Sequence, residues 1–135
     1  MAWRFDGETE VAVAKPVYDL EERLAVFAAR IVVCVNRMPG NIAGRYYAGQ
    51  LLRSGGSPAL HYGESQAAES NDDFIHKCKI ALKELKESRG NLRIQKLSKL
   101  MPDDDPDLVW LAQECEELIR ILATIIINRQ KRGKR

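Results

Sequence analysis

The spacing of apolar side chains in residues 73–88 restricts the fold more than any other feature of this chain. The apolar positions step by four, three and four residues and are Phe74, Cys78, Ala81 and Leu85. Side chains at this spacing line one face of an α-helix, which predicts a helix with one buried face. Asp72 and Asp73 stand at its start, where unpaired backbone N–H groups favour negative charge.

The same helical spacing recurs in three other segments, and turn or capping residues separate all four. It predicts helices over residues 16–37, from residue 41 onward, over residues 71–100, and after the acidic start at residues 103–107. No segment alternates apolar and polar residues as a strand does. Four amphipathic helices with short connections predict an all-α, antiparallel up-down-up-down four-helix bundle.

Two stretches interrupt this regular pattern. Ser54-Gly-Gly-Ser-Pro58 allows two interpretations, a turn or a kinked helix that continues to about Ser70. In the third helix Ser88 is expected on the buried face, and Gly90 weakens the helix by about 1 kcal/mol. The apolar stripe is predicted to resume after this glycine at Ile94, Leu97 and Leu100.

A chain of 135 residues fits one domain. We divide it into a flexible lead-in over residues 1–15, the bundle over residues 16–128 and a basic tail over residues 129–135. The three cysteines are far apart on apolar faces, so we expect them to be core residues in a reducing cytosol. The apolar stretches are shorter than the roughly 20 residues of a membrane span. We therefore expect a cytoplasmic protein without membrane contact.

The charge is distributed unevenly, although the formal net charge is only +2. One stripe of the third helix is basic and consists of Lys79, Lys83, Lys86, Arg93 and Lys96. The tail adds Arg129, Lys131, Arg132, Lys134 and Arg135. Both features suit the phosphates of RNA or DNA. A solvated face, or pairing with the acidic residues 103–117 within or between subunits, explains the stripe as well, and helix-dipole complementation explains the tail.

The first helix carries an arginine at every seventh position. These residues are Arg23, Arg30 and Arg37. Ion pairs between subunits and a simple exposed stripe are both compatible with this spacing.

Catalytic and metal-binding patterns are missing from the sequence. His76 and Cys78 are two positions apart and so point in different directions on a helix. We expect a protein that is not an enzyme and that binds no metal or other cofactor.

Several motifs in the second and third helices are similar to those of a known family. They are Gln50-Leu-Leu-Arg-Ser54, Ser57-Pro-Ala-Leu-His-Tyr-Gly-Glu64, Asp73-Phe-Ile-His-Lys77, Ile80-Ala-Leu-Lys-Glu84 and Glu87-Ser88. This set resembles the bacterial four-helix-bundle proteins called ribosomal-RNA intervening-sequence proteins. Many of these are encoded inside insertions in large-subunit rRNA genes, and their biochemical role is mostly unassigned.

The resemblance implies a left-handed up-down bundle that assembles into a homopentameric ring. It also implies that the segment through Pro58 stays in the second helix, with the proline at a bend. Distant relatives are accessory proteins of diversity-generating retroelements, which bind a reverse transcriptase and nucleic acid. Polar residues of the shared motifs are Gln50, Arg53, Ser57, Tyr62 and Glu64. We expect from them either a buried network with an Arg–Glu pair or a small-molecule site.

Two functional hypotheses follow. In the first, the ring binds RNA or DNA through its basic surfaces. In the second, it is a structural or adaptor protein that docks a protein partner, such as a reverse transcriptase, without nucleic acid. A ring needs two different contact patches on each subunit, and the acidic residues 103–117 and the basic residues 77–99 are candidates.

Overall fold

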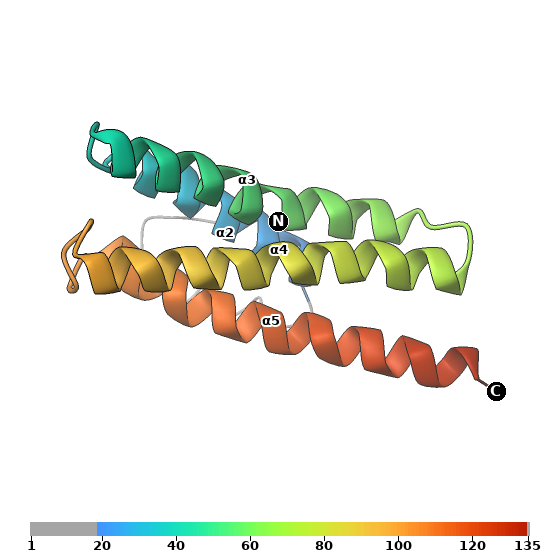
Figure 1. Ribbon diagram of the computed structural model, residues 1–135. Helices are drawn as coiled ribbons and strands as arrows, with labels where there is room; N and C mark the ends of the chain where they lie inside the picture. The colour runs from blue at the N-terminus through green and yellow to red at the C-terminus, as the bar shows by residue number, and fades with distance from the viewer. Residues whose placement is uncertain (1–18, 135) are drawn as a thin grey trace.

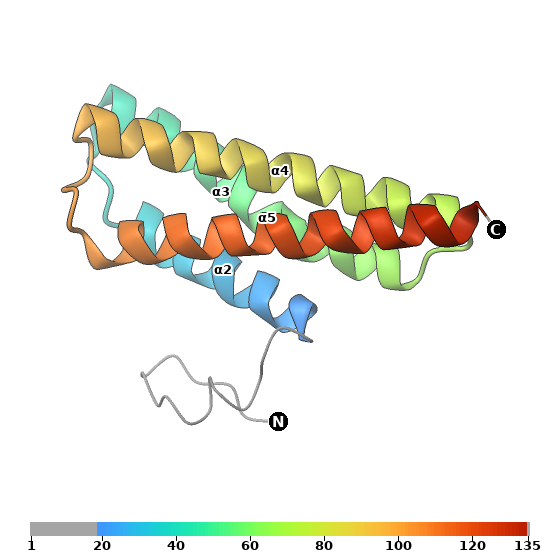
Figure 2. The ribbon, with the colours of Figure 1, turned by 90° about the horizontal axis from the view of Figure 1, so that it is seen from below.

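The computed structural model describes residues 19–134, and four helices contain most of them. They are α2 (Leu20–Val35), α3 (Ile42–Gln66), α4 (Asn71–Ser98) and α5 (Pro106–Gly133). Helices α2 and α4 each pack against both α3 and α5, and short loops reverse the chain between successive helices (Figure 1 and Figure 2). The predicted all-α, antiparallel up-down-up-down four-helix bundle is confirmed. The expected lead-in over residues 1–15 and helix start at residue 16 lie outside the described residues.

A polar side chain caps the start of each helix. Each cap accepts a hydrogen bond from the backbone N–H three residues later, and the caps are Asp19, Asn41, Ser70 and Asp105. Such a bond satisfies one of the N–H groups that have no partner inside the helix. At the other end of α4, Lys99 adopts a left-handed φ of 59° and terminates the helix. The helix boundaries are therefore fixed by local sequence.

The core lies along the axis of the bundle and uses the apolar positions at steps of three and four. Its fully buried members include Phe27, Ile31, Leu51, Leu85, Leu111, Leu118 and Leu122. The three cysteines are also fully buried in this core and are unpaired, as their spacing predicted. The cluster is continuous across all four helices.

Helix α3 is continuous through its two adjacent glycines and contains Pro58 in its interior. The helical interpretation of this segment is confirmed, and the turn interpretation is wrong. A Cβ atom at Gly55 would overlap Cδ1 of Ile31, so glycine allows α2 and α3 to approach here. The neighbouring Ser54 hydroxyl lies 2.8 Å from that of Ser88, and both side chains are fully buried. The helix ends at Gln66, a little before the expected residue 70.

The apolar stripe predicted at the end of α4 is wrong. Ile94 and Leu97 are 42% and 70% exposed, whereas Leu92 and Gln95 face the core. The buried positions keep stepping by three or four from Ser88, and residues 94 and 97 fall outside that series. Two members of this buried series are polar, Asn91 and Gln95. Gln95 donates to Asn91 at 2.7 Å, and Asn91 donates to the Tyr47 carbonyl at 3.0 Å.

The basic C-terminal residues differ in structure from the separate tail that the sequence suggested. Helix α5 continues to Gly133 without a break at residue 128. Arg129 is half-buried, and its guanidinium lies 3.7 Å from the centre of the Phe74 ring. It also donates to the Asn71 side chain at 3.0 Å. These contacts hold the last turns of α5 against the start of α4.

Candidate nucleic-acid interface

The basic stripe of α4 lies on the surface of the bundle. All five of its members, Lys79, Lys83, Lys86, Arg93 and Lys96, are exposed. The stripe extends over about 25 Å, because an α-helix rises about 1.5 Å per residue. None of the five forms an ion pair with another residue in the range 19–134. Their charges are therefore available to an anion in solvent.

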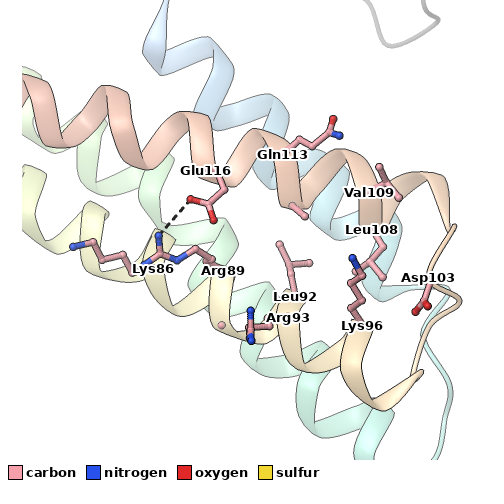
Figure 3. A pocket seen from close by; sticks show the side chains of 12 residues that line it. Lys86, Arg89, Leu92, Arg93, Lys96, Asp103, Leu108, Val109, Gln113 and Glu116 are labelled. Carbon is pink, nitrogen blue, oxygen red and sulfur yellow. Dashed lines mark hydrogen bonds and ion pairs between the residues drawn. The ribbon is translucent and has the colours of Figure 1, made fainter.

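One end of this stripe borders a groove of about 770 Å³ between α4 and α5 (Figure 3). We call it the α4–α5 groove. Its basic side chains are Lys86, Arg89, Arg93 and Lys96, and its apolar side chains are Leu92, Leu108, Val109 and Ala112. Figure 3 shows the basic side chains arranged along α4, with Glu116 directed toward Arg89 from α5. The groove is thus lined both by basic side chains of α4 and by apolar side chains of α4 and α5.

The two acidic side chains at the groove are already paired. Glu116 lies 3.4 Å from Arg89 across the groove, and Asp103 lies 2.7 Å from Lys99. The hydrogen bond from Lys99 lowers the pKa of Asp103, and the nearby charge of Lys96 lowers it further. Lys86, Arg93 and Lys96 form no ion pair within 4 Å with a carboxylate of residues 19–134. Arg89 was not among the residues predicted from the sequence, because it lies on the side of α4 that faces α5.

The C-terminal bases lie at the opposite end of α4. Arg129 contacts Phe74 and Asn71, as described above, and is half-buried. Lys131 and Arg132 in the last turn of α5 and Lys134 directly after it are exposed. Arg135 lies outside the described residues. The stripe therefore runs between the groove at one end of the bundle and three exposed bases at the other.

The seven-residue arginine series runs from α2 to Arg37, two residues beyond its end, and pairs with α5 and its N-cap Asp105 in the same molecule. Arg23 donates to both carboxylate oxygens of Glu114, at 3.0 and 2.8 Å. Arg30 lies 3.2 Å from Asp107, and Arg37 binds Asp105 at 2.9 Å and Asp107 at 2.8 Å. We call this set the arginine ladder. The structure shows these arginines paired within one molecule, which neither interpretation of their spacing anticipated.

The ion pairs of the arginine ladder shift the pKa values of their members and engage carboxylates of the acidic segment. Hydrogen bonds from Arg37 lower the pKa of Asp105, and the bond to Glu114 raises the pKa of Arg23. Arg30 also stacks on Trp110, with 4.4 Å between its guanidinium and the ring centre. Four carboxylates of the acidic segment over residues 103–117 are thus paired inside the molecule, those of Asp105, Asp107, Glu114 and Glu117. That segment is a weaker candidate for a contact patch than its composition suggested.

The polar residues of the family-like motifs are dispersed. Arg53 pairs with Glu84 at 2.9 Å and also with Glu87, whereas Glu64 lies 3.4 Å from His61 and 4.0 Å from Lys77. The expected Arg–Glu pair within this set is therefore absent. Gln50 lies 3.3 Å from Arg53 and joins its surface network.

Two members of the set are more enclosed. The Ser57 hydroxyl oxygen is buried and has no hydrogen-bond partner among residues 19–134. Tyr62 packs against the core, and burial raises its pKa. The structure does not bring these five residues into one small-molecule site.

The buried cysteines have the electrostatics of core thiols. Burial raises the pKa of Cys34 to about 11 and that of Cys115 to about 12. Within residues 19–134, no three His, Cys, Asp or Glu side chains are grouped so that they could hold a metal ion. No described helix has the length and apolar character needed to cross a membrane.

Comparison with solved structures found a protein with the same bundle. It is a protein of unknown function from the S23 ribosomal protein family from Bacteroides thetaiotaomicron, with 27% sequence identity and a TM-score of 0.70. The match covers 79% of this chain and 97% of the other. No protein-family model matches this chain, and no curated protein matches it.

Proposed function

We propose that this protein is a non-enzymatic, homo-oligomeric four-helix bundle that binds RNA or DNA nonspecifically in the cytoplasm. The observation that carries the proposal is the stripe of five exposed α4 bases that have no ion-pair partner within residues 19–134. Side chains of this kind bind phosphates and displace condensed counterions, which provides affinity without sequence readout. The groove at the end of the stripe is lined by no aromatic residue, so stacking on bases contributes nothing there.

The outer face of α3 supports the oligomeric part of the proposal. Ile42 and Leu60 are 81% and 70% exposed, and their separation of eighteen residues corresponds to five helical turns. Tyr46 is exposed on the same face, and both Gly49 and Gly56 have open space beside them. Apolar side chains and glycines on one exposed helix face suit close contact with another helix. We propose a pentameric ring, the assembly that the resemblance implies, which would multiply the weak affinity of each stripe.

The comparison supports an RNA connection only indirectly. The structural neighbour belongs to a family named for a ribosomal protein, although its own function is unknown. We propose that the present chain is a ribosomal-RNA intervening-sequence protein, on the strength of the motifs at Gln50–Ser54, Ser57–Glu64 and Asp73–Ser88.

The test measures the anisotropy of fluorescein-labelled RNA duplexes of two unrelated sequences as the full chain is added. We expect similar affinity for both sequences and a steep loss of affinity as salt is raised. The variant Lys83→Gln/Arg93→Gln should bind more weakly, with a salt slope reduced by about 1 for each lost phosphate contact. The matched control Arg45→Gln/Lys77→Gln removes the same two residue types outside the stripe. Equal affinity of the two variants, or no salt-dependent binding by the parent chain, contradicts the proposal.

An adaptor role remains the second candidate, because the exposed apolar face of α3 also suits a protein partner. In that case a partner such as a reverse transcriptase would bind while the anisotropy of labelled RNA stays unchanged. Substitution of Leu60 by Lys should then abolish partner binding, whereas Lys83→Gln/Arg93→Gln should leave it intact.

A further inference from the structure

Gly90 lies in the interior of α4, where packing within the molecule does not require a glycine. An interior glycine weakens a helix relative to alanine, because it loses more backbone freedom on folding. At Gly55 the close approach of Ile31 explains the glycine, since a Cβ atom would overlap Cδ1 of that side chain. At Gly90 no atom of residues 19–134 lies within 4 Å of the position that a Cβ atom would take. The open space beside Gly90 is therefore available to another molecule.

This open space belongs to the α4–α5 groove. The lining residues of α4 extend from Lys86 to Lys96, with Gly90 between them, and those of α5 extend from Leu108 to Glu116. At 1.5 Å per residue these stretches are about 15 Å and about 12 Å long. About three turns of a third helix, at 5.4 Å per turn, match this length. The groove thus has the dimensions of a short helix that lies along α4 and α5.

The lining of the groove favours an occupant that is both acidic and apolar. Three of its α4 bases form no ion pair within 4 Å with residues 19–134, and these are Lys86, Arg93 and Lys96. Val109 is 42% exposed, so part of the apolar lining is in contact with solvent. Figure 3 shows the bases on one helix and Val109 on the other. Carboxylates of an occupant would meet the bases, while its apolar side chains would cover Val109 and fill the space beside Gly90.

We propose that the α4–α5 groove binds an acidic amphipathic helix of a partner protein. The bound helix places leucine-sized side chains beside Gly90 and Val109, and carboxylates against Lys86, Arg93 and Lys96. Apolar side chains three and four positions apart anchor a helix in a groove of this kind. The proposal does not rest on the proposed nucleic-acid function, because a phosphate backbone has no apolar side chain to place beside Gly90.

The test uses a synthetic peptide as the probe and the full chain as the receptor. The peptide has about 14 residues and a rhodamine label, with leucine at steps of three and four and glutamate on the flanking positions. A second peptide has the same composition in an order that spreads leucine around the helix. We expect the anisotropy of the first peptide to rise as the full chain is added, with an affinity at least about tenfold above that of the second peptide.

A side chain at position 90 distinguishes docking in the groove from attraction by charge. Gly90→Leu fills the groove, leaves every charge in place and suits a helix better than glycine does. We expect it to weaken binding of the first peptide by more than about tenfold, with an unchanged or raised midpoint of thermal unfolding. The matched control is Gly49→Leu, at an exposed position of α3 where a Cβ atom also has no atom of residues 19–134 within 4 Å. It should leave peptide affinity unchanged.

The charge requirement is tested with Arg93→Gln/Lys96→Gln, which should weaken binding of the first peptide as well. The control Lys79→Gln/Lys83→Gln changes the same helix outside the groove. It should leave peptide affinity nearly unchanged, although it weakens RNA binding if the proposed function holds.

Several outcomes would overturn the proposal. Equal binding of the two peptides, or binding of neither, would show that the groove does not select an amphipathic helix. Equal affinity of Gly90→Leu and Gly49→Leu for the first peptide would place docking outside the groove. Loss of self-association in Gly90→Leu, measured by sedimentation, would assign the groove to a second copy of the chain. Because the peptide is measured without RNA, failure of the docking and failure of the nucleic-acid proposal are distinguished.

Discussion

Helix α5 packs against α2 and α4, which both present regularly spaced basic residues, and the two sides differ in whether these residues have ion-pair partners. On the α2 side, the arginine ladder pairs every one of its guanidinium groups with a carboxylate of α5. On the α4 side, only Arg89 finds a partner on α5, and Lys86, Arg93 and Lys96 remain without one among residues 19–134. The comparison shows that a regular series of basic residues can be structural or available for binding, and that pairing geometry distinguishes the two.

The largest loss of stability is expected on substitution of Asp105, which both pairs with Arg37 and caps α5. Asp105 binds Arg37 through both carboxylate oxygens and also accepts the Leu108 N–H that starts α5. Asp105→Ala removes the cap and leaves a buried N–H without its partner, so we expect a loss of about 2–3 kcal/mol in the free energy of unfolding. Urea denaturation measures this change. Asp104→Ala, an exposed neighbour, should change stability by less than about 0.5 kcal/mol, and an equal loss in both variants would contradict the role of Asp105.

Asp105 also makes the free energy of unfolding depend on pH in the acidic range. Its pKa in the folded protein is lowered, chiefly by hydrogen bonds from Arg37, below an unfolded value of about 3.9. The ionised group therefore stabilises the fold above that value, and the contribution is lost as pH falls through the folded pKa. Urea titrations across the acidic range should show stability falling with pH, with a smaller slope in Asp105→Asn. An unchanged slope in the variant would show that Asp105 is not the titrating group.

The smallest contribution to stability is expected from the ion pair at the α4–α5 groove, between Arg89 and Glu116. Arg89 and Glu116 are about half exposed and lie 3.4 Å apart, so their attraction is screened by solvent. A double-mutant cycle with Arg89→Ala and Glu116→Ala should give a coupling energy of about 0.5 kcal/mol or less. A coupling energy as large as that between Arg23 and Glu114 would contradict the proposed difference between the α2–α5 and the α4–α5 ion pairs.

The sequence predicted the bundle because each helix carries its own periodic pattern and its own cap. It predicted Phe74, Cys78, Ala81 and Leu85 correctly, since burial on one face follows from spacing within a helix. It failed at Ile94 and Leu97, where Asn91 and Gln95 occupy buried positions that an apolar pattern does not reveal. Asn91 and the Gln95 amide nitrogen are satisfied by hydrogen bonds to the Tyr47 carbonyl and to each other, while the Gln95 amide oxygen has no partner among residues 19–134.

The candidate site was predictable only in part, for a related reason. The five bases of the α4 stripe were identified from their spacing, and all five are exposed. The arginine ladder could not be assigned, because Arg23 and Glu114 are 91 positions apart along the chain. Spacing within one helix does not reveal which residue of another helix lies opposite. The groove depends on the packing of α4 against α5, and it too appears only in three dimensions.

The most direct test compares the same substitution on the two sides of α5, as Arg23→Gln and Arg93→Gln. Each variant is measured twice, by urea unfolding and by the anisotropy of labelled RNA. We predict that Arg23→Gln lowers the free energy of unfolding by about 1–2 kcal/mol, because it leaves the partly buried Glu114 without its bidentate partner, and that it leaves RNA affinity unchanged. Arg93→Gln should leave stability within about 0.5 kcal/mol and reduce the salt slope of RNA binding by about 1. Equal effects of the two substitutions on both measurements would contradict the account.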